Sequence, residues 1–279
     1  MNNIKKEGEI IIPIVRNHYQ AIIVVAFAIL IGVISWQLMP TGGLDMRNDI
    51  LPALQHWKAP WLEGMPIFPW ATLVLMPLRL ITPRAATSLI NFISVIITAL
   101  VIRKYKGNML FVVPIVFSPI GQPLLFNGQT DAVVLTSLLL PAGFDLLFFW
   151  KPQVLAHAFW VRFRSNFKIY LIAGTSILLI SFFIWGFWPG ELLDFTRDHL
   201  LGGYWNMSLW PYSIPIGLIL IFLSLKKTDE SYGLMASPLL FPYVSAGSYI
   251  GLLIGVASKW PKLFGLVYLG WIIKKFIIG

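Results

Sequence analysis

Long runs of apolar residues, separated by short polar segments, make up most of this chain. Several runs reach the roughly 20 residues that an α-helix needs to cross a bilayer core of about 30 Å. A backbone in lipid must satisfy its own hydrogen bonds, and the alternation typical of barrel strands is absent, so the pattern predicts an all-α bundle. We expect about eight spans, at residues 18–38, 86–102, 109–125, 131–150, 168–187, 211–225, 232–257 and 261–278.

One further apolar stretch, from Met65 to Ile81, is interpreted differently. If it were a full crossing, the basic segment from Arg103 to Lys106 would lie outside, against the positive-inside bias. We therefore predict a juxtamembrane or re-entrant helix on the outer side, with Trp70 at the interface and Arg79 reaching the headgroups.

Composition supports a membrane protein. The 279 residues are 57% hydrophobic and 12% charged, far from the average of a soluble domain. The first run ends at Met39-Pro40 rather than at a small-residue cleavage site, so we expect a retained span and one integral membrane domain over residues 1–279. We expect a multi-pass protein of the plasma (inner) membrane.

The net charge of +9 could suggest a nucleic-acid partner. Most Lys and Arg residues, however, fall in the segments predicted to lie inside, so the charge indicates topology and membrane lipid as a partner, and no nucleic acid. The chain has no cysteine, which excludes disulfides and thiolate metal sites. The histidines are scattered without ligand spacing, so no metal site is assigned.

Two acids follow the first predicted span. Asp45 and Asp49 are four residues apart, so a short helix would place both carboxylates on one face, where partial desolvation would suit one of them to act as a general base. The alternative is a solvated loop pair with Arg47. A divalent cation held by the two carboxylates also stays open, although two acids alone do not define its site.

Polar residues also interrupt the apolar pattern at Asn127 to Asp131 and at Lys151 to Gln153. Polar groups beside hydrocarbon are costly unless partnered, which favours a functional site over a simple polar turn. Gln129 and Asp131 are candidates to bind sugar hydroxyls or to orient the base, with helix capping by Thr130 or Asp131 as the rival. A straight helix would place Lys151 about 30 Å from Asp131, as an inner-face anchor near Asp145.

The order of these motifs resembles the integral membrane glycosyltransferases of the GT-C superfamily, in particular the polyprenyl-phosphate-mannose-dependent mannosyltransferase and arabinofuranosyltransferase-like group. The resemblance spans most of the chain. Its parts are the acid after the first span, Ile67-Phe68-Pro69-Trp70 leading to Met76-Pro77-Leu78, Asn127-Gly128-Gln129-Thr130-Asp131, Lys151-Pro152-Gln153 and Asn206-Met207-Ser208-Leu209. The chain is shorter than most such proteins, and we expect no outer soluble domain.

The resemblance implies an inverting transfer of mannose or a related sugar on the outer face of the cell membrane, from a polyprenyl-phosphate donor to a glycan or lipid acceptor. It implies Asp45 as the base, with Asp49 as second candidate, and a reaction that requires no nucleotide sugar; no cofactor is assigned, and a divalent cation stays possible. We expect substrate contacts from Gln129 and Asp131, and from four residues of the second outer segment: Arg197, His199, Asn206 and Ser208. The alternative for Arg197 is an ion pair with Asp194 or Asp198.

Two other classes of function remain. One is a secondary transporter or lipid flippase, because polar breaks in spans can form a midplane site. No inverted repeat is visible, and the acids lie in outer segments, which disfavours it. The other is a non-catalytic membrane subunit, which would tolerate Asn at both Asp45 and Asp49.

Overall fold

The computed structural model describes residues 2–63, 68–195 and 206–273, and these contain helices and turns but no β-strand. The prediction of an all-α fold is confirmed for this part of the chain. Within it, three helices are long and apolar enough to cross a membrane: the His18–Leu38 part of α1 (Asn2–Leu38), α4 (Pro83–Lys104) and α10 (Phe167–Trp185). They match three of the expected spans.

The structure has fewer continuous spans than the eight predicted. In the described residues a fourth could be formed only by a bent pair, Met109–Val116 and Gly121–Asn127, whose axes meet at 73°. The predicted spans at 131–150 and 232–257 are divided into short helices, with breaks near proline, which removes a backbone donor and clashes with the preceding turn. The spans predicted at 211–225 and 261–278 are represented by single helices, Ile214–Lys227 and Pro261–Ile273, of 14 and 13 described residues. Apolar composition predicted the divided segments as helical but did not reveal their breaks.

The remaining elements are short. In chain order they are η1 (Met46–Ile50), α2 (Leu51–Gln55), η2 (Pro60–Glu63), α3 (Ala71–Leu75), η3 (Met76–Leu80), η4 (Met109–Phe111), α5 (Val112–Val116), α6 (Gly121–Asn127), α7 (Asp131–Val134), η5 (Leu135–Leu139), η6 (Phe144–Phe148), α8 (Pro152–Leu155), η7 (Ala156–Ala158), α9 (Phe159–Ser165), α11 (Trp188–Phe195), α12 (Ile214–Lys227), α13 (Glu230–Ala236), η9 (Ser237–Leu239), η10 (Ala246–Tyr249), α14 (Ile250–Lys259) and α15 (Pro261–Ile273). The short α3–η3 helix is too short to cross, in line with the juxtamembrane helix predicted there.

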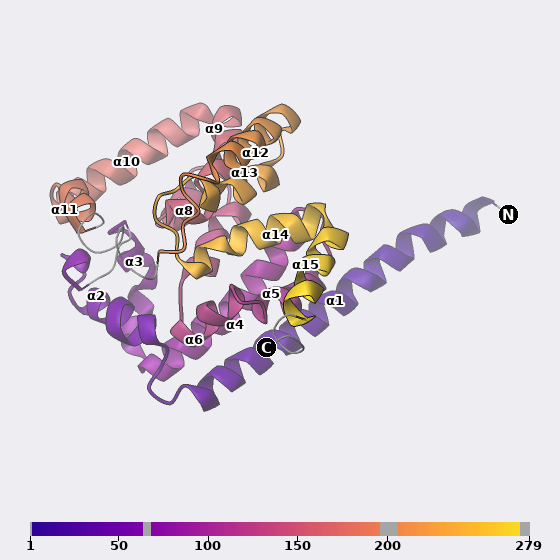
Figure 1. Cartoon of the computed structure of the whole chain (residues 1–279), viewed down its shortest axis with the longest axis horizontal. Helices are drawn as coiled ribbons and strands as arrows, with labels where there is room; N and C mark the ends of the chain where they lie inside the picture. The colour runs from indigo at the N-terminus through magenta and orange to yellow at the C-terminus, as the bar shows by residue number, and fades with distance from the viewer. Residues whose placement is uncertain (1, 64–67, 196–205, 274–279) are drawn as a thin grey trace.

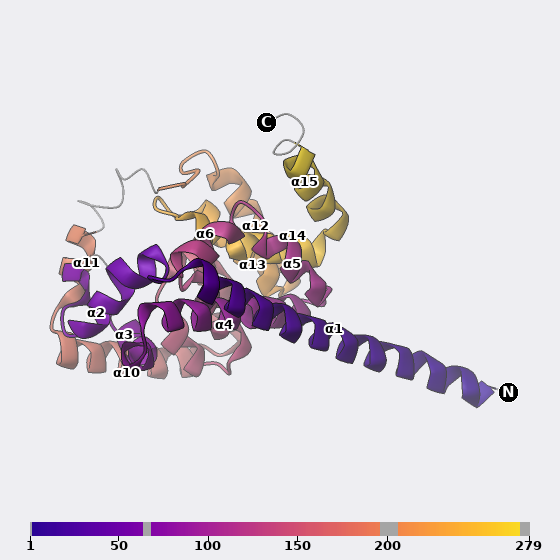
Figure 2. The ribbon, with the colours of Figure 1, turned by 90° about the horizontal axis from the view of Figure 1, so that it is seen from below.

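Helix α4 runs through the middle of the bundle and is the most buried of the three long helices. Figures 1 and 2 show α1 passing beside it and projecting beyond the body. On α4, the Asn91 amide donates to Ser35 Oγ of α1 (2.8 Å) and to the carbonyl of Leu125 in α6 (2.9 Å). The carboxyl ends of α1 and α6 are thereby held close together, and the two polar segments that follow them begin at the same place.

The predicted span at 131–150 is a hairpin. α7 and η5 run in one direction, the chain turns through Pro141 to Gly143, and η6 packs back against η5. Gly143 has φ +93°, a conformation that side-chain-bearing residues rarely adopt. The chain therefore returns toward Asp131 by the time it reaches Lys151.

Candidate functional site

Two glycines allow the segment after α1 to touch the segment after α6. Gly43 N donates to Thr87 Oγ1 on α4 (2.8 Å), and a Cβ on Gly43 would lie 2.5 Å from the Asn127 carbonyl carbon. Gly128 ends α6 with φ +66° and packs against Met46 and Thr87. Any larger residue at Gly43 would push its backbone away from that of Asn127. The close approach that brings Asp45 to Gln129 therefore depends on glycine at position 43.

Asp45 and Asp49 lie one turn apart, at the start and near the end of η1. Both carboxylates are half-buried, whereas Arg47 between them is exposed and donates to Thr41 Oγ1 (3.0 Å) and Asn48 Oδ1 (3.1 Å). The Gln129 side chain lies beside Asp45, where it lowers the pKa of that carboxyl as a hydrogen-bonding neighbour. The expectation that the acids share one face is met, and the alternative of a solvated pair around Arg47 is not.

Asp131 and Lys151 form an ion pair from the two arms of the hairpin, with Nζ 2.6 Å from Oδ2. Asp131 is fully buried, and its Oδ1 accepts a hydrogen bond from Ser248 of η10 (2.7 Å). The predicted separation of Lys151 from Asp131 and its placement near Asp145 are wrong, because Asp145 pairs with Arg162 instead. The estimate assumed a straight helix rising about 1.5 Å per residue, whereas the chain reverses at Gly143.

Burial shapes the electrostatics of the site. Burial raises the pKa of Asp45, against the opposing effects of the Gln129 side chain and the charge of Lys151. Burial and the charge of Asp45 raise the pKa of Asp49 to about 6. Burial alone would lower the pKa of Lys151, but the Asp131 carboxylate beside it raises the value and keeps the ammonium charged.

Gln129 carries a polar atom without a partner. Its side chain is 9% exposed, and Oε1 makes no hydrogen bond in the described structure. Oε1 lies against Gly247, where a Cβ would come within 2.3 Å of it. A buried amide oxygen left unsatisfied costs roughly 1 to 3 kcal/mol, so it is retained at a cost in stability.

Two residues of the second outer segment, Asn206 and Ser208, contact the 241–244 loop. Asn206 Nδ2 donates to the Pro242 carbonyl (2.9 Å), and Asn206 Oδ1 accepts from Val244 N (3.1 Å). Ser208 Oγ donates to the Phe241 carbonyl (2.6 Å). Both side chains therefore hold the 241–244 loop rather than facing Asp45. Arg197 and His199 lie outside the described residues.

Within the described residues, no group of three or more His, Asp or Glu side chains could hold a metal ion. Asp45 and Asp49 offer at most a two-carboxylate arrangement, and the divalent cation stays a prediction.

The sequence did not predict two residues of the site, Ser248 and Tyr243. Ser248 donates to Asp131, and the electrostatic neighbours of Tyr243 are Lys151 and the three acids. No local signal marks either residue, because their segment reaches the site only through tertiary packing.

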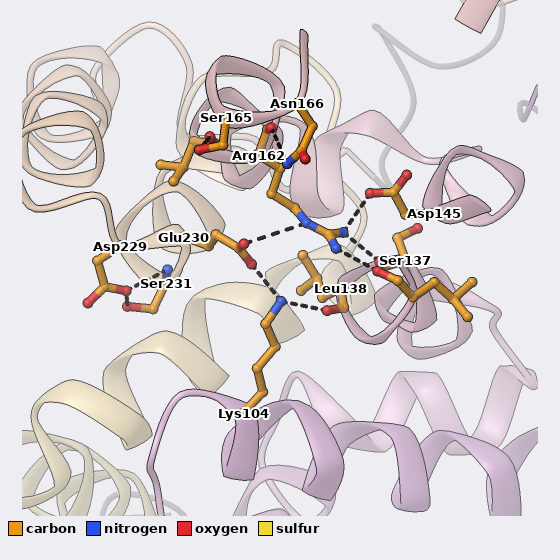
Figure 3. Close-up of polar contacts among 12 residues, drawn as sticks. Lys104, Ser137, Leu138, Asp145, Arg162, Ser165, Asn166, Asp229, Glu230 and Ser231 are labelled. Carbon is orange, nitrogen blue, oxygen red and sulfur yellow. Dashed lines mark hydrogen bonds and ion pairs between the residues drawn. The ribbon is translucent and has the colours of Figure 1, made fainter. Parts of the chain in front are cut away.

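A second polar cluster lies at the Lys104 end of α4 (Figure 3). Lys104 Nζ contacts Glu230 (2.7 Å) and the Leu138 carbonyl (2.5 Å). Arg162 contacts Asp145 (2.6 Å), Glu230 (3.5 Å) and the carbonyls of Ser137 (2.8 Å) and Leu140 (2.5 Å). Tyr170 donates to Asp145 as well. We call this group the ion-pair network, and the group of Asp45, Asp49, Gln129, Asp131 and Lys151 the acid site.

Comparison with known proteins identifies no relative of this chain. No family model matches the chain, and no curated protein or solved structure matches it.

Proposed function

We propose that this chain is an integral membrane glycosyltransferase that moves mannose or a related sugar from a polyprenyl-phosphate donor to a glycan or lipid acceptor, with inversion at the anomeric carbon. The observation that carries the proposal is the position of Asp45. It is a half-buried carboxylate of raised pKa, beside the Gln129 amide and the Lys151 ammonium. A base of this kind is what activation of a sugar hydroxyl needs at neutral pH.

The proposed reaction has one chemical step. The Asp45 carboxylate takes the proton from the acceptor hydroxyl, whose oxygen attacks the anomeric carbon on the face opposite the phosphate. The bond between that carbon and the phosphate oxygen breaks, and its electron pair leaves with the polyprenyl phosphate. Polyprenyl phosphate is already a good leaving group, so a base and cationic donors suffice. The charge of Lys151 acts on Asp45, Asp49 and Asp131, so its ammonium can serve as one such donor. Arg197 and His199 stay predicted donors, because they lie outside the described residues.

The finer topology belongs to the same proposal. We infer that the short apolar helices outside the 131–150 hairpin also cross the membrane, so that the number of crossings approaches the eight predicted, with the acid site on the outer face of the plasma membrane. Thr87, near the Pro83 end of α4, is in contact with the Gly43 segment, whereas Lys104 ends the helix in a basic cluster. The bias of basic residues toward the inner side supports this orientation.

The test is sugar transfer by purified protein in lipid nanodiscs, with a panel of radiolabelled polyprenyl-phosphate sugars and acceptors. Asp45→Asn should lower transfer by about 10² to 10⁴-fold, the usual size of a general-base contribution. The control is Glu191→Gln, which makes the same carboxylate-to-amide change on an exposed position of α11 and should leave transfer unchanged. Loss with Asp49→Asn but not Asp45→Asn would move the base to Asp49.

Full transfer by the Asp45→Asn, Asp49→Asn double variant would overturn the proposal. One observation favours a second candidate, a transporter or flippase: the 73° break between α5 and α6 lies directly before Gln129, and broken helices often border transport sites. Wild-type protein that transfers no sugar but moves a lipid-linked sugar across vesicles would support that candidate.

A further inference from the structure

Tyr243 lies in the non-helical loop between η9 and η10, and the segment that begins at Asn206 holds this loop in place. Met207 N donates to the Val244 carbonyl (2.8 Å), on the residue next to Tyr243. Together with the contacts of Asn206 and Ser208 described above, it fixes the backbone on both sides of Tyr243. We call Asn206, Met207 and Ser208 the clasp.

The same loop continues directly into the acid site. Gly247 packs against the Gln129 amide, and Ser248 donates to Asp131. Tyr243 precedes these residues and is half-buried. Its electrostatic neighbours are, in order of strength, Lys151, Asp131, Asp45 and Asp49. In the described part of the chain its hydroxyl makes no hydrogen bond, so a phenol group faces four charged side chains without a partner.

We propose that the Tyr243 hydroxyl binds the phosphate group of a polyprenyl-phosphate ligand together with the Lys151 ammonium, and that the clasp positions Tyr243 for this contact. The ligand class rests on the proposed function, whereas the residue and its placement rest on the geometry of the loop.

The chemistry of the neighbours favours phosphate over the acceptor sugar. Asp45 and Asp49 are hydrogen-bond acceptors suited to a sugar hydroxyl, whereas a phosphate oxygen needs donors. A phenol keeps its proton at neutral pH, because its ordinary pKa is about 10, and can therefore donate to a phosphate oxygen. The Lys151 ammonium has three N–H donors, one of which contacts Asp131, and the others can join the phenol on a phosphate.

The first experiment measures binding of a short-chain polyprenyl monophosphate to the protein in nanodiscs, for wild type and Tyr243→Phe. The change removes only the hydroxyl, and we expect about tenfold weaker binding, the size of one hydrogen bond to a charged group. The control is Tyr212→Phe, an exposed residue in which the same change should have no effect. The polyprenyl alcohol, which lacks phosphate, should bind wild type and Tyr243→Phe equally.

The second experiment tests the clasp with a double-mutant cycle. Asn206→Ala should weaken binding of the monophosphate several-fold in the wild-type background but not when Tyr243 is already Phe. Thermal unfolding of each variant separates this effect from general destabilisation. A structural role alone would make the Asn206→Ala effect the same in both backgrounds.

Equal binding of the monophosphate by wild type and Tyr243→Phe would overturn the inference, as would failure of wild type to bind it. If binding depends on Tyr243 but no sugar is transferred, the inference stands and the proposed transfer fails. If wild type transfers sugar and Tyr243→Phe does so with unchanged KM and kcat, the proposed function stands and the inference fails.

Discussion

The acid site and the ion-pair network lie toward opposite ends of α4, a helix of 22 residues and about 33 Å. In the network, two cations face two buried or half-buried acids and also bind three backbone carbonyls. In the acid site, three carboxylates share one lysine, which already contacts Asp131. The same residue types are thus fully partnered at one end and left short of partners at the other.

The difference indicates what each group is for. Charges that are paired and hydrogen-bonded hold a fold together, whereas half-buried acids left short of cationic partners weaken it and persist where chemistry needs them. The network has a clear structural task, because Lys104 and Arg162 bind the carbonyls of Ser137, Leu138 and Leu140 at the tip of the hairpin. The acid site has no comparable task, which supports a functional role.

The largest effect should come from Arg162→Met. This change leaves Asp145 fully buried without its cation and removes the donors from two carbonyls. Loss of one partner from a buried ion pair costs about 3 to 5 kcal/mol, so we expect unfolding at clearly lower temperature or denaturant concentration. The control is Arg164→Met, which is exposed on the same helix. Equal stability of the two variants would mean that the network does not hold the fold.

Lys151→Met tests the one ion pair inside the acid site. We expect destabilisation toward the lower end of the same range, since Asp131 is fully buried but keeps its contact with Ser248. The double variant Lys151→Met, Asp131→Asn should regain most of the stability, measured by denaturant unfolding, and yet remain inactive in sugar transfer. A double variant with wild-type transfer would assign the pair to structure alone.

Gly247→Ala should affect the acid site more than the fold. The added Cβ would lie 2.3 Å from Gln129 Oε1, so the amide must move away from Asp45. We expect a loss of about 1 to 3 kcal/mol in unfolding free energy and about 10²-fold in transfer. Gly265→Ala in α15, where nothing lies within 4 Å, is the matched control. Unchanged transfer by Gly247→Ala would show that Gln129 does not orient the base.

The smallest effect is a pH dependence from Asp49. Its pKa rises from 3.8 in the unfolded chain to about 6 in the fold, so the folded state binds the proton more tightly. Its contribution to stability is therefore full below about pH 4, falls as pH rises to about 6, and is constant above. Asp49→Asn should remove this slope in unfolding experiments across pH 4 to 7. An identical slope in the variant would assign the titration to another group.

Part of this fold follows directly from the sequence. The three long spans were predicted within a few residues, because a continuous apolar run without internal proline leaves a helix as the only satisfied backbone. The sequence did not predict the hairpin at 131–150, because this segment is as apolar as a membrane span. Its turn depends on Gly143 and on cations from α4 and α9, which sequence spacing does not reveal.

The acid site was also predicted in part. Asp45, Asp49, Gln129 and Asp131 were named as candidates, and the structure brings them together. Asn206 and Ser208 were assigned to substrate because their local pattern cannot show that their hydrogen bonds are used by the 241–244 loop. Tyr243 and Ser248 were missed for the same reason.

The hairpin between Asp131 and Lys151 also has a consequence for biogenesis. A nascent segment as apolar as 131–150 favours a complete crossing during insertion, which would leave the two residues on opposite faces of the bilayer. In the folded chain they are 2.6 Å apart, and the tip between them is held in part by Arg162. Arg162 is synthesised after the hairpin. Ser248, which donates to Asp131, is synthesised later still, so the acid site reaches its final form only after residue 248 has left the ribosome.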